Sequence, residues 1–306
     1  MTNKNPLQCD PKTGFCEVSA GAQEQPHIKV QNNQELPMRI IYYTDPICSA
    51  CWAIEGVLRK LKLEYGHVFV FDCHMGGLLP AFGKGYDPGD FYTSEDLAKL
   101  WDEASDHYRV PINGGIWLND PLNSSFPPSI AYKAAQLQSQ DKADDLLRHL
   151  REMLFVGQKN IAKEDVILKA AQETKLDIDQ IQLDIKGKGK SDFMHDLELG
   201  KELKVRGFPT LFFFNLAGDH KILYGVHAYP DYENYILKLD PLAQKREYDK
   251  YPLALMRHFQ TMTVKELSIL AEYGYFEAEQ DLEKLEKEGK ITAYVTPKGK
   301  LWRINR

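Results

Sequence analysis

The stretch that decides the fold runs from residue 38 to residue 75 and reads MRIIYYTDPICSACWAIEGVLRKLKLEYGHVFVFDCHM. Its first part, residues 38–44, is short, β-branched and aromatic, which is typical of a buried strand. Residues 48–65 then place apolar side chains at helical spacing, and Gly66 ends that pattern. A second apolar run, 67–73, predicts another strand. The order strand–helix–strand predicts a βαβ unit with parallel strands and a right-handed crossover.

The pair Cys48 and Cys51 lies where the first strand ends and the helix begins. Free N–H groups and the positive end of the helix dipole at that place favour a thiolate, so Cys48 is the expected nucleophile and Cys51 the resolving thiol. Ser49 and Ala50 carry no positive charge, so we expect only a moderate lowering of the Cys48 pKa. Zinc binding is the alternative, but it needs about four ligands, and no second CxxC or paired histidines are present.

A second motif, Gly207-Phe208-Pro209-Thr210, stands directly before an apolar run. Proline cannot donate to a sheet ladder, so it belongs at the start of a strand. The residue before it can offer backbone hydrogen bonds to an incoming peptide, which then adds as a strand. We assign Pro209 to the catalytic site and peptide binding to Phe208, Thr210 and Trp52. The alternative is an ordinary trans proline before a strand.

Outside these motifs, the chain divides into three parts. Residues 1–36 are polar and aperiodic and predict a flexible tail. Residues 37–240 form the main domain, with a helical insertion at about 90–203. After the insertion, residues 211–215 and 221–224 predict a hairpin of two strands, and residues 230–239 predict a short helix. Residues 241–306 predict a small appendage of two helices and two short strands, similar to a winged helix. The helices expected in the insertion cover 94–108, 128–140, 143–155, 163–174, 178–187 and 191–203. The fold class is therefore α/β: a thioredoxin fold with a large helical insertion and a C-terminal winged-helix-like appendage.

The composition limits the functions to consider. The chain has 306 residues, 43% of them apolar and 27% charged, as in ordinary globular proteins. A net charge of −6 argues against nucleic acid or an anionic membrane as the partner. Acidic and basic residues balance each other in the appendage, which favours protein contact over DNA reading. The N-terminus lacks the apolar run of a secretory signal, so we expect a cytoplasmic protein, with no cofactor and no metal.

These motifs resemble the DsbA family of thioredoxin-like proteins, and within it the intracellular FrnE-like branch. The likeness is carried by the DPxCxxCW start at residues 45–52, the inserted helices and residues 207–210, and it spans roughly residues 38–239. It implies a thioredoxin fold, dithiol chemistry at Cys48 and Cys51, and a cis peptide before Pro209. The chain departs from periplasmic members, which carry Pro-His between the cysteines and a signal peptide.

A further likeness reaches past that domain. The phrases DPICSACWAIEGVLRKLKLEYG, LFVGQKNI and PTLFFFN, with the extra C-terminal segment, are similar to the YjbH or SpxH adaptor group. That resemblance implies a partner that is a transcription regulator and a second partner that is the AAA+ protease ClpXP. The His-rich N-terminal cluster associated with the group is absent from this chain.

Three of the five cysteines lie outside the CxxC pair. Cys9 and Cys16 flank a Pro- and Gly-containing turn, so they are either a second redox pair on an arm that exchanges with Cys48 and Cys51, or two unconnected tail residues or loose metal ligands. Cys73 ends an apolar run and is expected to be an inert core residue.

Two functions from different classes follow. The first is an enzyme, a thiol–disulfide oxidoreductase or isomerase acting on protein thiols and disulfides. The alternative is a cytoplasmic adaptor that presents a transcription regulator to ClpXP. An isomerase of small aromatic or glutathione substrates ranks third, because that branch usually has serine where Cys48 stands.

Overall fold

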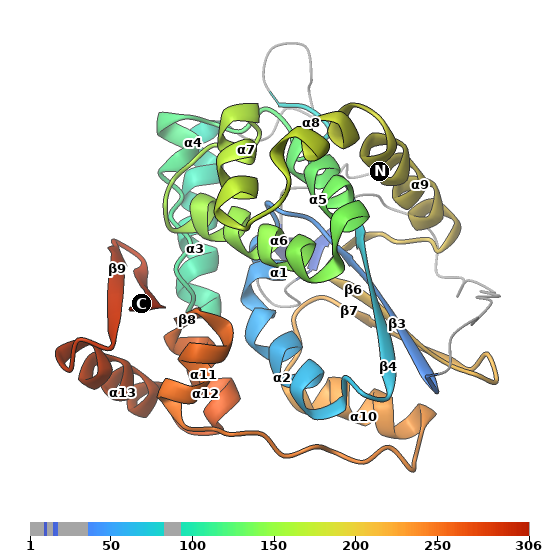
Figure 1. The fold of residues 1–306 in the computed structure, drawn as a ribbon, viewed down its shortest axis with the longest axis vertical. Coiled ribbons are helices and arrows are strands. Elements are labelled where there is room, and N and C mark those ends of the chain that lie inside the picture. Colours follow the sequence, from blue (N-terminus) through green and yellow to red (C-terminus); the bar gives the residue numbers. More distant parts are fainter. Residues whose placement is uncertain (1–8, 11–14, 18–35, 83–92, 306) are drawn as a thin grey trace.

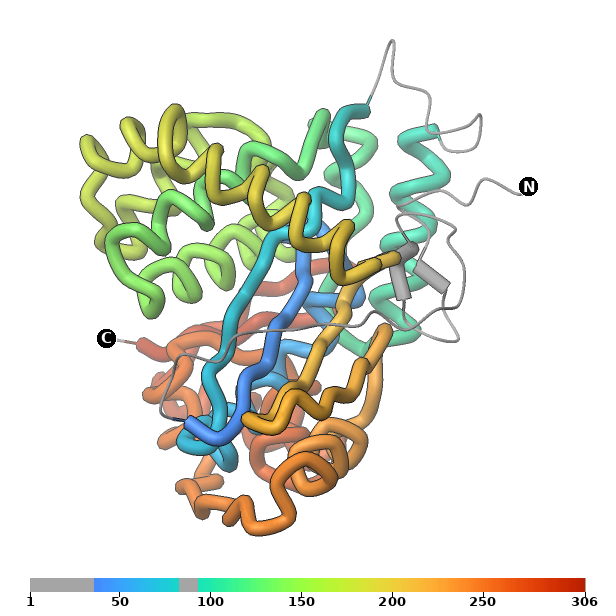
Figure 2. Tube along the Cα trace, turned by 90° about the vertical axis from the view of Figure 1, so that its right-hand side faces the viewer, coloured from blue at the N-terminus to red at the C-terminus, as the bar shows by residue number. Residues whose placement is uncertain are grey.

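The computed structural model describes residues 9–10, 15–17, 36–82 and 93–305. Its central sheet has the strand order β4-β3-β6-β7 (Figures 1 and 2). The two strands of the βαβ unit, β3 and β4, are parallel, and β6 and β7 form an antiparallel hairpin, as the sequence predicts. The strands are β3 (Met38–Thr44), β4 (Phe69–Met75), β6 (Thr210–Asn215) and β7 (His220–Tyr224).

Strand β3 is buried on both faces, which explains its nearly continuous apolar sequence. Neighbouring side chains point to opposite faces. On one face Tyr43 donates to the Asp196 carbonyl at 3.1 Å and lies against Gly200, both in α9 (Lys188–Glu202). On the other face Thr44 donates to the Tyr42 hydroxyl at 2.9 Å and accepts a hydrogen bond from Arg151, in α6 (Gln140–Phe155), at 2.6 Å. Helices therefore cover both sides of the sheet.

The helix that follows the CxxC motif is divided in two. Helix α1 (Ser49–Ala53) and helix α2 (Glu55–Tyr65) meet at Ile54, whose backbone leaves the helical region at φ −92° and ψ 1°. The sequence pattern predicted one continuous helix. The break is invisible in that pattern because Ile54 is itself fully buried and fits the apolar spacing.

The inserted segment is helical, as expected, and lies between β4 and β5 in the chain (Figure 1). Its last helix packs on β4, and its α6 packs on α5. The short helix α4 was not expected. The helices of this segment are α3 (Ser94–Tyr108), α4 (Ile116–Asn119), α5 (Phe126–Gln138), α6 (Gln140–Phe155), α7 (Glu164–Glu173), α8 (Ile178–Lys186) and α9 (Lys188–Glu202).

After helix α10 (Tyr229–Leu239), which packs on α2 and β6, the chain reaches the C-terminal segment. This segment has its own core, centred on Met256, Leu267 and Trp302, and a sheet of strand order β8-β10-β9. The sequence missed its first helix and first strand; the winged-helix description remains a prediction. The elements are α11 (Pro252–Phe259), β8 (Thr261–Thr263), α12 (Val264–Ala271), α13 (Tyr275–Lys287), β9 (Ile291–Thr296) and β10 (Gly299–Ile304).

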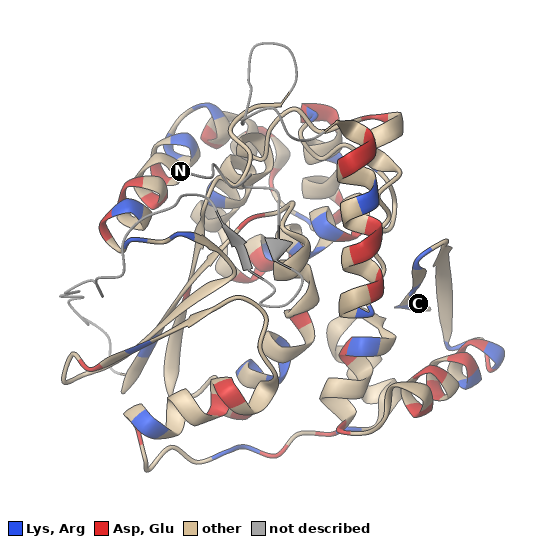
Figure 3. Ribbon diagram, turned by 180° about the vertical axis from the view of Figure 1, so that it is seen from behind, with Lys and Arg blue, Asp and Glu red and all other residues tan. Residues whose placement is uncertain are grey.

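Buried ion pairs attach the C-terminal segment to the rest of the protein. Helix α12 packs on α2, where a Cβ on Gly56 would come within 3.1 Å of the Glu266 backbone. The Glu266 carboxylate accepts from Arg148 at 2.7 Å and pairs with Arg59 at 3.0 Å. Acidic residues predominate along α13, and its lysines, Lys284 and Lys287, lie in the last turn (Figure 3). The segment therefore shows no one-sided basic helix.

Two short strands lie within residues 1–36, the part predicted to be a tail. Strand β1 (Cys9–Asp10) pairs antiparallel with β2 (Phe15–Glu17). Strand β2 in turn pairs antiparallel with β5 (Gly207–Phe208), directly before Pro209. The polar sequence of this segment gives no strand signal, because β2 pairs with a strand that lies about two hundred residues later in the chain.

Candidate active site

Cys48 stands where the sequence places it, at the junction of β3 and α1. It is the N-cap residue of α1, with extended backbone angles, and its N–H donates to the Asp45 carbonyl at 3.2 Å. The Cys48 sulfur accepts a hydrogen bond from the Cys51 N–H at 3.3 Å. The sulfur thus occupies the place where N-cap side chains satisfy unpaired helix donors.

The proline motif lies against this sulfur. The Phe208–Pro209 peptide bond is cis, which confirms the expectation drawn from the family resemblance. The Cys48 Sγ lies 3.9 Å from the Phe208 carbonyl oxygen. The Pro209 carbonyl accepts from the Gly225 N–H at 2.8 Å, which ties the loop to the end of β7. Two motifs 160 residues apart therefore meet at one site.

Burial changes the expected electrostatics of the pair. Cys48 and Cys51 are both fully buried. Desolvation raises the pKa of the Cys48 thiol well above its usual range, so the predicted moderate lowering is wrong for this conformation. Burial also opposes ionisation of Cys51, but the hydrogen bond from the Cys48 thiol and the charge of Arg151 lower its pKa. The acidic member of the pair is therefore the inner cysteine.

Arg151, which the sequence analysis did not single out, is the cation of the site. Its side chain is 1% exposed and comes from α6 in the inserted segment. The guanidinium donates to the Thr44 hydroxyl at 2.6 Å and to the Asp45 carbonyl at 3.2 Å, and it pairs with Glu55. It therefore supplies the positive charge that Ser49 and Ala50 do not.

Asp45 lies under the site as a buried carboxyl group. It accepts from the Leu78 N–H at 2.7 Å, the Ile47 N–H at 3.0 Å and the Ser125 hydroxyl at 2.8 Å. Burial raises its pKa to about 6 despite these donors. A carboxyl with this pKa can accept or release a proton near neutral pH.

The residues predicted to bind peptide are buried. Trp52 stacks on Phe155 with ring centroids 5.7 Å apart and donates to the Pro111 carbonyl at 3.1 Å, so its contacts are those of a packing residue. The Thr210 hydroxyl donates to the Gly207 carbonyl at 2.8 Å. Phe208 is 1% exposed, but its backbone forms the edge strand β5.

Cys73 is buried beside Tyr132, and burial raises its pKa to about 12. A thiol with so high a pKa is unreactive near neutral pH, which agrees with the expected core role. Cys9 and Cys16 are direct partners in the β1–β2 ladder, and Cys16 is also the partner of Phe208. Their role as a second redox pair remains a prediction.

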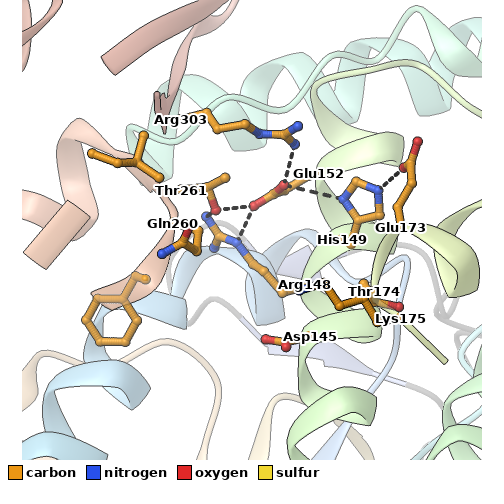
Figure 4. A pocket seen from close by; sticks show the side chains of 12 residues that line it. Asp145, Arg148, His149, Glu152, Glu173, Thr174, Lys175, Gln260, Thr261 and Arg303 are labelled. Atoms are coloured by element: carbon orange, nitrogen blue, oxygen red, sulfur yellow. Dashed lines mark hydrogen bonds and ion pairs between the residues drawn. The ribbon is translucent and has the colours of Figure 1, made fainter. Parts of the chain in front are cut away.

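A cavity of about 680 Å³ lies away from this site, between α6, α7 and the C-terminal strands (Figure 4). Its charged lining residues pair with one another. Arg148 bonds Glu152 at 2.8 Å, His149 bonds Glu173 at 2.5 Å, and Arg303 pairs with Glu152 at 3.5 Å. Although burial opposes it, Arg148 lowers the pKa of Glu152 to about 2. These contacts explain the polar lining as part of the junction with the C-terminal segment.

In the part of the chain that the structure describes, no group of three or more His, Cys, Asp or Glu side chains is placed to hold a metal ion. Within the same residues, no helix has the length and apolar character needed to cross a membrane.

Comparisons with known proteins agree with this geometry. Residues 42–235 match the family model described as thioredoxin. A putative protein disulfide isomerase from Nitrosomonas europaea superimposes with a TM-score of 0.54 at 17% identity, covering 67% of this chain and 96% of its own. The cytosolic disulfide reductase DsbM from Pseudomonas aeruginosa superimposes with a TM-score of 0.51 at 20% identity, covering 67% of this chain and all of its own. These likenesses establish the fold.

Full-length similarity leads to a different group. The ClpXP adapter protein SpxH from Halalkalibacterium halodurans is 31% identical over 98% of both chains. The SpxH protein from Bacillus subtilis is 27% identical over 87% of this chain and 89% of its own. This similarity extends over nearly the whole chain, whereas the two disulfide enzymes cover 67% of it. The chain belongs to the thioredoxin-like family and, over its whole length, to the SpxH family of ClpXP adapter proteins.

Proposed function

We propose that this protein is a cytoplasmic adapter that binds a client protein, a transcription regulator, and presents it to the protease ClpXP. The observation that carries this proposal is the 98% coverage of both chains in the match to an SpxH adapter. The disulfide enzymes of similar fold account for only about two thirds of this chain. The sequence alone ranked disulfide exchange first, and the full-length relatives reverse that order.

The C-terminal segment has features that suit a protein partner. Strand β9 is at the edge of its sheet, and its Tyr294 and Val295 are 57% and 73% exposed. Phe276, on α13, is 68% exposed. Exposed aromatic and aliphatic side chains of this kind are typical of protein-binding surfaces. The buried pairs of Glu266 attach this segment to helices α2 and α6.

The test compares protein half-lives in the source organism. Deleting the gene should lengthen the half-life of a small set of transcription regulators, and loss of ClpX should lengthen the same half-lives with no additional effect in the double deletion. A Tyr294→Ser/Val295→Ser variant should fail to restore degradation, whereas Leu183→Ser, at a 68% exposed position on α8, should restore it. Half-lives unchanged by the deletion would remove the adapter proposal.

Disulfide exchange is the second candidate, and the contact between the Cys48 sulfur and the Phe208 carbonyl supports it. In this reaction Cys48 attacks a protein disulfide and Cys51 releases the mixed disulfide. Rates of reduction of a model protein disulfide by the natural chain and by Cys48→Ser decide the question. Equal rates would exclude the enzyme, and normal client degradation by Cys48→Ser would show that the adapter works without this chemistry.

A further inference from the structure

The outer edge of β5 is the position at which an extended peptide would pair beside Pro209, and the chain itself fills that position. Strand β2 pairs antiparallel with β5, with Cys16 opposite Phe208 and Glu17 opposite Gly207. Added strands of this kind are a general mode of peptide recognition. The protein thus holds one of its own segments where a substrate peptide would lie.

The register places the backbone of Cys16 opposite the residue that contacts the reactive sulfur. Directly opposed residues in an antiparallel pair have Cα atoms about 4.5–5.5 Å apart. Cys16 is opposed to Phe208, whose carbonyl oxygen is 3.9 Å from the Cys48 Sγ. The backbone of Cys16 is therefore about one strand spacing from the residue that touches Cys48.

The same register pairs Cys16 with Cys9 on its other side. The Cα separation of opposed residues falls within the range that a disulfide requires, about 4.4–6.8 Å. Strands β1 and β2 can therefore carry a Cys9–Cys16 disulfide without rearrangement. Cys48, moreover, is fully buried, so an outside disulfide reaches it only if a covering element moves. The element on the substrate edge is β2.

We propose that the Cys9–Cys16 pair is the built-in substrate of this site, and that β2 must leave β5 before another peptide can bind. This inference rests on the dithiol chemistry of the second candidate function and is independent of ClpXP. In the first step the Cys48 thiol loses its proton, and the resulting thiolate attacks the Cys16 sulfur. The Cys48–Cys16 bond forms, the Cys9–Cys16 bond breaks, and Cys9 leaves as a thiolate that takes up a proton.

In the second step the Cys51 thiolate attacks Cys48. The Cys48–Cys51 bond forms and Cys16 leaves as a thiolate, which is protonated in turn. Two electrons and two protons pass from Cys48 and Cys51 to Cys9 and Cys16, and the number of disulfides is unchanged.

The first experiment traps the mixed disulfide in the full-length chain. A Cys9→Ser/Cys51→Ser variant is treated with oxidised glutathione and mapped by mass spectrometry without reduction. We expect a Cys16–Cys48 link in most molecules, formed at a rate independent of protein concentration. The matched control adds Phe15→Cys and Cys16→Phe. This exchange moves the thiol by one residue to the opposite face of the strand, so the intramolecular link to Cys48 should be lost.

The second experiment tests occupancy of the edge. Glu17→Pro keeps every cysteine but disrupts β2, the middle strand of its ladder. Alkylation of Cys48 by iodoacetamide should become faster by about tenfold, a change equal to about 1.4 kcal/mol in the docking of β2. Two results would overturn the proposal. The first is a link to Cys48 that forms equally well from a cysteine at position 15 and from one at position 16. The second is an alkylation rate of Cys48 that does not change in Glu17→Pro. Because neither readout involves ClpXP, such a result would leave the adapter proposal intact.

Discussion

Arg151 joins three elements at the scale of a single residue. It reaches from α6 to the end of β3 and to Glu55 at the start of α2. Arg151 stands at helical spacing from Leu147 and Leu154, so it falls on the apolar face of α6. A single cation on such a face is the one signal by which the sequence could have revealed this residue. Its partners could not be predicted, because they depend on how distant segments pack.

Replacing Arg151 with Met should destabilise the protein by about 3 kcal/mol, since removing one member of a buried pair leaves its partners unsatisfied. The pKa of Cys51 should rise in this variant, because the guanidinium lowers it. Denaturant unfolding and thiolate absorbance measure the two effects. Lys99→Ala is the control, because Lys99 pairs at 3.8 Å on an exposed helix face and should change stability by less than about 0.5 kcal/mol. Equal losses of stability in the Arg151→Met and Lys99→Ala variants would contradict this account.

Asp45 makes stability depend on pH. Burial raises its pKa from 3.8 to about 6, so the native state holds the proton more tightly than the unfolded chain does. The resulting stabilisation is fully present below about pH 4 and is lost as the pH rises through about 6. The shift of about two pKa units corresponds to about 3 kcal/mol.

Comparison with Asp45→Asn, which does not titrate, isolates this contribution. The free energy of unfolding of the natural chain, minus that of Asp45→Asn, should fall by about 3 kcal/mol between about pH 4 and pH 7. Asp141→Asn, at an exposed position, serves as the control. A difference that stays constant with pH would show that Asp45 does not titrate in this range.

At the scale of elements, the end of β4 determines the position of the proline loop. A Cβ on Gly76 would lie 1.8 Å from the Phe208 ring, so only glycine permits this packing. Gly76→Ala should displace Phe208 and cost about 1–3 kcal/mol through overpacking. Unfolding measurements should show partial recovery in Gly76→Ala/Phe208→Leu, in which the side chain is smaller. No recovery in the double variant would argue against a direct clash.

Elements with a strong local pattern could be predicted. The βαβ unit, the hairpin after Pro209 and the bounds of α3 follow from periodicity and end signals within each segment. Helix α11 was missed although Pro252 marks its start, because eight residues give a weak period. Strand β2 was missed for a physical reason: its pairing with β5 is a long-range contact that leaves no pattern in residues 15–17.

At the scale of the whole molecule, Glu266 joins the C-terminal segment to the thioredoxin part. Its carboxylate is 4% exposed and contacts Arg59 and Arg148. Glu266→Gln leaves the Arg59 guanidinium without its carboxylate and removes one of the carboxylates that contact Arg148, so it should weaken the junction by about 3 kcal/mol. Hydrogen exchange should therefore become faster in α12 and stay unchanged in β3.

The control for this junction is Glu283→Gln, which removes an exposed pair with Lys300 at 3.2 Å. This substitution should change the rate of hydrogen exchange in α12 very little. Loss of client degradation in Glu266→Gln, with disulfide exchange retained, would assign the two activities to different parts of the molecule. A rate of hydrogen exchange in α12 of Glu266→Gln equal to that of the natural chain would show that the ion pairs do not hold the junction.

The arrangement of Glu266 between two arginines also has a consequence for how this protein can change over generations. The Glu266 carboxylate pairs with guanidinium groups from α2 and α6, and Arg148 also pairs with Glu152, so a neutral substitution at position 59, 148 or 266 leaves the charges of this buried cluster unbalanced. A change that leaves no unbalanced buried charge requires coordinated replacements at all three sites, for example by apolar residues of similar volume. Across homologous chains we therefore expect the residues at positions 59, 148 and 266 to change together, so that the residue at one position predicts the residues at the other two.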